Sequence, residues 1–141
     1  MDQNTANETM NIRPKLSYVI LCDAVGTAPD GRKTLYGLFT KILARKFPHV
    51  QPTLAIVTRW SYGTGGHAMM VQITDSDKKE IFKTPTPFNF VLNDPLTSVD
   101  IVLGIQNMQF SRPGTYWIQV SIDGQPQEDL TLFVEKMELP E

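Results

Sequence analysis

Apolar and polar residues alternate along most of this chain, most clearly in its C-terminal third. Residues 116–122 carry apolar side chains at every second position, and after an Asp-Gly pair residues 130–134 repeat the pattern. A period of two predicts β-strands with one face toward a core, and an Asp-Gly pair predicts a tight turn. We therefore expect a β-hairpin in which Ile118 lies opposite Leu132.

Further strands are expected through the rest of the chain, separated by turns rich in glycine, proline and aspartate; most show the same alternation, and residues 16–25 carry apolar side chains on both parities. The expected strands are residues 16–25, 33–43, 53–62, 67–75, 80–83, 88–92 and 98–110. Turns spaced by roughly 8 to 12 residues are typical of sandwiches, and no segment sustains the helical period of about 3.6 residues. We predict an all-β fold, a two-layer antiparallel β-sandwich of about eight strands.

The sequence Pro113-Gly114-Thr115-Tyr116 makes this prediction more specific. In immunoglobulin-like sandwiches, a tyrosine near the start of a late strand donates its hydroxyl to a nearby backbone group and fixes the connection between the sheets. Tyr116 is placed for that role, so we predict an immunoglobulin-like sandwich. The alternative is a half-buried aromatic residue without such a bond.

Length and the polar N-terminus predict the domain organisation. A chain of 141 residues is the size of one domain and can bury a self-sufficient core. Residues 1–14 lack periodicity and end at Pro14, so we expect them to form a disordered leader. Residues 15–141 are expected to form a single β-sandwich domain.

Composition excludes several classes of partner. The 13 basic and 15 acidic residues give a net charge of −2, which offers no basic field for a nucleic acid. The longest apolar run, residues 19–22, is too short to span a membrane, and a single cysteine cannot form an intrachain disulfide. We expect a cytoplasmic protein that binds neither nucleic acid nor membrane.

Short motifs in the N-terminal half resemble a known group of proteins. They are Leu21-Cys22-Asp23, a Gly-Arg-Lys turn at residues 31–33, the Leu-Tyr-Gly-Leu-Phe segment at residues 35–39, and a Gly-His pair at residues 66–67 that opens a strand. Together they resemble a family of short uncharacterised bacterial proteins, a domain of unknown function, over most of the chain after residue 15. The resemblance implies a compact β-rich bacterial domain and no assigned catalytic residue.

One set of residues defines an enzymatic alternative. A nucleophilic cysteine needs a neighbouring imidazole to lower its pKa, so Cys22, Asp23 and His67 could serve a small hydrolase or thiol-dependent enzyme. Cys22, however, lies within an apolar strand pattern, where a free cysteine is most often an inert core residue. For Asp23 we expect a structural role, as an ion pair or turn hydrogen bond with Arg32 or Lys33.

We expect no metal ion and no cofactor. One cysteine and two histidines are too few ligands for zinc, and the acidic turn Asp75-Ser76-Asp77 is followed by two lysines that would repel calcium. The glycine-rich residues 63–66 precede a strand and lack the lysine and helix of a phosphate-binding loop.

The most informative anomaly is a pair of aromatic residues on the outward side of the hairpin. Trp117 and Phe133 are expected to lie opposite each other, and Val102 and Met108 could extend them into an apolar patch. A second copy, another protein or the leader could cover this patch, or the pair could simply stack half-exposed. We predict a non-enzymatic interaction or ligand-binding module, with these four residues as interface candidates and self-association through an outer sheet face as the hypothesis to test.

Overall fold

The structure, a computed structural model, describes residues 11–138, and every regular element in that range is a β-strand. The ten strands are β1 (Lys15–Thr27), β2 (Lys33–Leu38), β3 (Lys41–Ala44), β4 (His49–Ser61), β5 (Gly65–Thr74), β6 (Glu80–Lys83), β7 (Phe88–Leu92), β8 (Val99–Phe110), β9 (Gly114–Ile122) and β10 (Gln125–Lys136). The predicted all-β class is confirmed. In this part of the chain we find no helix of sufficient length and apolar character to cross a membrane.

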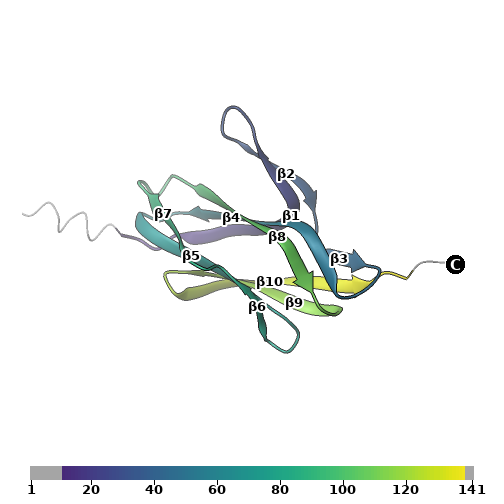
Figure 1. Cartoon of the computed structure of the whole chain (residues 1–141). Coiled ribbons are helices and arrows are strands. Elements are labelled where there is room, and N and C mark those ends of the chain that lie inside the picture. The colour runs from purple at the N-terminus through teal and green to yellow at the C-terminus, as the bar shows by residue number, and fades with distance from the viewer. Residues whose placement is uncertain (1–10, 139–141) are drawn as a thin grey trace, which may run out of the picture.

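Two sheets share one core (Figure 1). The four-stranded sheet has the order β2-β1-β4-β8, and the six-stranded sheet has the order β3-β10-β9-β5-β6, with β7 also paired to β5. Alternate side chains of both sheets meet in a single cluster: Ile56 and Trp60 come from β4, and Val71, Ile118 and Leu132 come from β5, β9 and β10. The period-two pattern therefore places its apolar set between two layers, away from water.

Three details differ from the predicted sandwich. The described residues form ten strands rather than about eight, and β3 pairs with β10 in parallel, whereas the prediction was fully antiparallel. The expected strand 33–43 is divided between the sheets, because its first part is β2 and its end is β3. Gly37 has a φ of 68°, a left-handed conformation that glycine adopts at low cost, and the chain crosses between the sheets just after it.

In the hairpin of β9 and β10, the side chains predicted to point into the core do so, but the two strands pair in a different register. Ile118 lies opposite Leu130, and Leu132 lies opposite Tyr116, so the expected pairing of Ile118 with Leu132 is wrong by two residues. The register shift between Pro126 and Glu128 moves the pairing one residue toward the expected one, because without it Ile118 would lie opposite Asp129. Because the error is an even number of residues, the inward-facing set keeps its face.

The Tyr116 hydroxyl donates a hydrogen bond to the Arg112 carbonyl oxygen, four residues earlier, at 2.6 Å. Its ring is buried and meets Phe110 edge-on, with 5.0 Å between the ring centroids. This is the hydrogen bond to a nearby backbone group that the Pro-Gly-Thr-Tyr sequence predicts for Tyr116. It fixes the connection that carries the chain from β8 in one sheet to β9 in the other.

The first described residues are held against the sandwich. The Ile12 amide donates to the Thr64 hydroxyl, and the Thr64 amide donates back to the Ile12 carbonyl, each at 3.0 Å. Pro14 is buried and lies so close to Gly63 that a Cβ at Gly63 would be 2.7 Å from it. The packed part of the chain therefore begins before the predicted boundary at residue 15. The remainder of the predicted leader, residues 1–10, lies outside the described residues.

Candidate functional site

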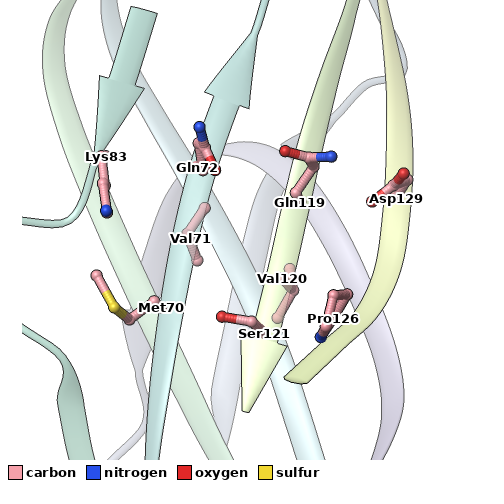
Figure 2. A pocket seen from close by; sticks show the side chains of 9 residues that line it. All are labelled: Met70, Val71, Gln72, Lys83, Gln119, Val120, Ser121, Pro126 and Asp129. Carbon is pink, nitrogen blue, oxygen red and sulfur yellow. The ribbon is translucent and has the colours of Figure 1, made fainter. Parts of the chain in front are cut away.

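A row of four polar side chains crosses the outer face of the six-stranded sheet. Lys83 of β6 pairs with Gln72 of β5, Gln72 pairs with Gln119 of β9, and Gln119 pairs with Asp129 of β10. Figure 2 shows the four side chains side by side on successive strands. They lie on the outer face because their strand neighbours of opposite parity, such as Val71, are buried in the core. We call these four residues the polar row.

The polar row lies in a hollow of the sheet surface. One depression of about 230 Å³ contains the whole row and extends past Met70, Ser121 and Pro126 (Figure 2). A second depression of about 200 Å³ shares Gln72, Gln119 and Asp129 with the first and extends the other way, past Thr74 and Trp117. Because they share three lining residues, we treat the two depressions as one feature, the trough.

Trp117 forms the aromatic end of the trough. Its neighbours across the sheet are Thr74 on β5 and Thr131 on β10, so two hydroxyl groups flank the indole. The Lys78 ammonium lies 4.9 Å from the centroid of an indole ring, in a cation–π contact. Trp117 is half-buried, and this end of the trough therefore offers an aromatic ring next to hydroxyl and ammonium groups.

The charges of the trough balance. Lys83 and Lys78 supply two positive groups, and Asp129 supplies one negative group. Glu80 adds the second negative group at the border, where its carboxylate accepts a hydrogen bond of 3.0 Å from the Gln72 amide nitrogen. Amide side chains both donate and accept hydrogen bonds. With Glu80 counted at its border, the trough carries no net formal charge, and its amides can both donate and accept hydrogen bonds.

The structure separates the four predicted interface residues. Trp117 and Phe133 share the outer face of the six-stranded sheet, but Trp117 lies opposite Thr131 and Phe133 lies opposite Thr115, so they are diagonal neighbours. Val102 and Met108 belong to β8, in the other sheet, and cannot extend that face.

The surroundings of these residues also differ from one another. Phe133 is 45% exposed, whereas Met108 is 6% exposed and belongs to the core. Val102 packs against Cys22, Ala55 and Val57 on the outside of the four-stranded sheet. The expected four-residue apolar patch is therefore not assembled, because the sequence pattern gives the parity of each strand but not its sheet.

Cys22 and Asp23 do not form part of a catalytic arrangement. Cys22 is fully buried on β1, its thiol donates to the Ala24 carbonyl oxygen at 3.5 Å, and burial raises its pKa. The Asp23 carboxylate lies directly against Gly37. Arg32, an expected partner of Asp23, pairs with Asp30 instead, at 2.6 Å. Within residues 11–138 no ion pair of Asp23 is found.

His67 lies in the other sheet and has partners of its own. Its Nδ1 is 2.7 Å from an Asp123 carboxylate oxygen, and its Nε2 is 2.8 Å from the Thr64 carbonyl oxygen. Both ring nitrogens therefore have a hydrogen-bond partner within the protein. The ring is 3% exposed and ties the loop before β5 to the turn after β9. The three residues of the enzymatic alternative are therefore not brought together.

Cys22 is expected to resist alkylation at neutral pH. The reactive species is the thiolate, and burial both blocks the reagent and disfavours that form. Iodoacetamide should modify native protein at least about 100-fold more slowly than protein unfolded in urea, because reaction requires transient opening. Mass spectrometry of timed samples measures both rates; equal rates would show that the thiol is accessible, and a faster rate in the native protein would show that it is activated.

The acidic turn at residues 75–77 uses its carboxylates internally. Asp75 accepts hydrogen bonds from the amides of Asp77 and Lys79, each at 2.9 Å, and Asp77 pairs with Arg112. No group of three or more His, Cys, Asp or Glu side chains that could hold a metal ion occurs among the residues that the structure describes. The turn therefore serves the chain's own backbone.

The polar row was not identified from the sequence, although a signal for it exists. Gln72 and Gln119 occupy outward parity positions of two predicted strands, and Trp117 was recognised on the same face. What the sequence lacked was the pairing of β9 with β5, two strands far apart along the chain. Without that pairing, four polar residues on four strands look like ordinary solvent-facing positions.

Comparison with solved structures finds one similar fold with a TM-score above 0.5 among those described here. The alkylpurine DNA glycosylase AlkC of Pseudomonas fluorescens, bound to DNA containing an abasic site analog, matches with a TM-score of 0.54 and 11% identity, over 94% of this chain and 33% of that chain. A β-glucosidase from Listeria innocua in complex with isofagomine matches with a TM-score of 0.47 and 8% identity, over 89% of this chain and 17% of that chain. A Niemann-Pick type C2 protein from the Japanese carpenter ant has a TM-score of 0.40 and 10% identity, over 90% and 95% of the two chains.

At 11% identity the likeness to the glycosylase concerns the fold alone, and this chain spans only about a third of the glycosylase and a sixth of the glucosidase. No curated protein matches the sequence. The predicted resemblance to an uncharacterised domain family is confirmed, since residues 17–135 match a family over most of the chain. The chain belongs to the family described as "Family of unknown function (DUF6941)".

Proposed function

We propose that this chain is a non-enzymatic binding module and that the trough on its six-stranded sheet is the ligand site. The observation that carries the proposal is the polar row, in which Lys83, Gln72, Gln119 and Asp129 cross four neighbouring strands within one depression. A rigid sheet holds these groups in a fixed pattern, as preorganised recognition requires. The trough lies on regular strands rather than on loops, so the pattern does not depend on ordering a flexible segment.

The fold that we propose for this module is immunoglobulin-like. In that fold, strands A, B and E lie next to one another in one sheet, and strands C, F and G in the other. The orders β1-β4-β8 and β5-β9-β10 fit these positions, and Tyr116 stands near the start of β9, which takes the place of strand F. The hydrogen bond from Tyr116 to Arg112 supports the same assignment.

The chemistry of the trough favours a short neutral oligosaccharide as the ligand. Vicinal hydroxyl groups both donate and accept hydrogen bonds, and the amides of Gln72 and Gln119 can meet both demands at once. The balanced charges give no net attraction for phosphate or for other anions. The part of the Trp117 ring that Lys78 leaves uncovered offers a flat apolar surface to the carbon–hydrogen face of a sugar, with Thr131 beside it on β10.

Two other candidate functions have less support. The hydrolase or thiol-dependent alternative needs Cys22 and His67 in one cleft, and they lie in different sheets with separate partners. Self-association through Trp117 and Phe133 stays a prediction. Lys78, however, covers part of the Trp117 ring, and Phe133 of β10 lies opposite Lys41 of β3. These charged neighbours leave little continuous apolar surface on that face.

Titration with a panel of neutral oligosaccharides, followed by amide chemical shifts, tests the proposed ligand site. We expect at least one sugar to shift the amides of β5, β9 and β10. The substitution Gln119→Ala should weaken its affinity by roughly tenfold, the worth of one or two hydrogen bonds. Gln109→Ala is the matched control, because Gln109 is an exposed glutamine of β8 outside the trough. The proposal is wrong if no sugar binds, or if Gln119→Ala and Gln109→Ala bind equally well.

A further inference from the structure

β8 is a long strand with an open edge. It pairs with β4 on one side, and within the described residues no strand pairs with it on the other. The other strands at sheet edges are short: β2 has 6 residues, β7 has 5, and β3 and β6 have 4 each. Short edges limit pairing with foreign strands. The 12-residue edge of β8 is therefore the exception in this molecule.

Two other strands extend past their short neighbours, but each is protected. The pairing of β1 with β4 shifts register between Leu16 and Tyr18, and the pairing of β10 with β9 shifts between Pro126 and Glu128. Register shifts twist an edge, and proline and charged residues oppose strand addition. The pairing of β8 with β4 contains no such shift, and residues 99–106 contain no lysine, arginine or proline.

We propose that two copies of this chain pair antiparallel through residues 99–106 of β8, about a two-fold axis. A strand is self-complementary under such an axis, because each free amide and carbonyl of one edge meets its counterpart in the other. The pairing would join two four-stranded sheets into one continuous sheet. The regular part of the edge ends at Asn107, whose φ is 55°.

Charge and space at the edge select the register. Asp100 is the only charged residue of the stretch, and Arg59 holds its carboxylate through two hydrogen bonds of 2.7 and 2.9 Å. Residues opposite each other in an antiparallel pair share a face, so one residue must lie on the axis. An axis at Leu103 places Asp100 opposite Gln106 of the second copy and Val102 opposite Gly104.

This register has room for the side chains that it brings together. A Cβ built at Gly104 would have no atom within 4 Å, so there is free space over Gly104. A depression of about 510 Å³ on the outer face of the sheet is bordered by Val102, Gly104 and Gln106, and it reaches the edge itself. Val102 of the second copy can therefore pack over Gly104 without a clash. An axis at Asp100 would instead place two carboxylates opposite each other.

Sedimentation equilibrium over a range of protein concentrations tests the proposal. We expect the wild type to form a dimer, and Val102→Lys to weaken it by at least about tenfold, because an inserted lysine is a common protection of edge strands. Val91→Lys is the matched control, since Val91 is 65% exposed on β7 in the other sheet. Trp117→Asp should leave the dimer unchanged, which separates the β8 edge from the outer face of the six-stranded sheet.

Two substitutions at the exposed Gln106 test the register without disturbing the fold. Gln106→Asp should weaken the dimer and Gln106→Lys should strengthen it, each by roughly two- to thirtyfold, because each change faces Asp100 twice in the symmetric pair. If circular dichroism shows that Val102→Lys does not fold, the two Gln106 variants still test the proposal. A wild type that stays monomeric, a dimer insensitive to all three β8 variants, or one that Trp117→Asp abolishes would overturn the proposal.

Discussion

Replacing Trp60 by alanine is expected to lower the free energy of unfolding by about 3–5 kcal/mol. Trp60 is fully buried between the sheets, and its ring lies 6.0 Å from that of Phe90, centroid to centroid. Its indole nitrogen donates to the Thr58 hydroxyl at 3.1 Å and to the Met69 sulfur at 3.4 Å. The substitution would leave a cavity in a closely packed core, and the surroundings could collapse only in part.

Urea denaturation followed by far-ultraviolet circular dichroism measures this loss without relying on tryptophan fluorescence. Trp117→Ala is the matched control, because it removes the same side chain from the half-buried outer face and should cost about 1 kcal/mol or less. Trp60→Phe should fall between them, since it keeps a ring but loses the two bonds from the indole nitrogen. Equal losses for Trp60→Ala and Trp117→Ala would contradict the assignment of Trp60 to the core.

The difference between the two tryptophans could be read from the sequence. Trp60 shares its parity with Leu54 and Ile56, and Trp117 has the parity opposite to Ile118 and Val120. Alternation alone therefore predicted which aromatic faces the core, as the structure confirms. Parity is a local property of a strand. The predicted inward and outward sides are therefore correct even where the predicted hairpin register is wrong by two residues.

Other features depend on contacts that no local pattern encodes. The division of residues 33–43 between two sheets follows from where the chain crosses after Gly37, and nothing in the local pattern of residues 33–43 marks that crossing. Val102 and Trp117 were expected on one face because both point outward, yet they point outward from opposite sheets. The trough arises from two hairpins that are far apart along the chain, β5–β6 and β9–β10, and the pairing of β5 with β9 brings its residues together.

The two proposed surfaces are compatible with each other. The trough lies on the outer face of the six-stranded sheet, whereas the open edge of β8 belongs to the four-stranded sheet. Pairing through β8 would leave both troughs of the dimer open. A bivalent module can bind a repeating ligand more tightly than one site alone when the spacing allows both sites to engage. An oligosaccharide long enough to reach both troughs would show this gain, and a shorter one would not.

Asp123→Ala is expected to lower the free energy of unfolding by about 2–4 kcal/mol, because it leaves the buried His67 without its carboxylate partner. It also removes the 2.9 Å bond from the Ala68 amide and places alanine at a φ of 51°, which asparagine tolerates better. Asp123→Asn should therefore cost less, since its single amide oxygen keeps an acceptor for the Ala68 amide, although an NH2 group replaces the oxygen that faces His67 and the charge is lost. Asp30→Asn is the control, because its pair with Arg32 is exposed.

The stabilisation by Asp123 is expected to disappear in acid. Burial acts to raise the pKa of Asp123, but the hydrogen bonds from His67 and the Ala68 amide outweigh it and hold the pKa below its usual value. A carboxyl whose folded pKa is lowered contributes its full stability above the unfolded value, about pH 4, and loses it as the pH falls through the folded value. The gap in unfolding free energy between the wild type and Asp123→Asn should therefore shrink below about pH 4. Urea titrations at a series of acidic pH values measure this gap, and a gap that persists to pH 2 would show that the carboxylate charge does not stabilise the buried histidine.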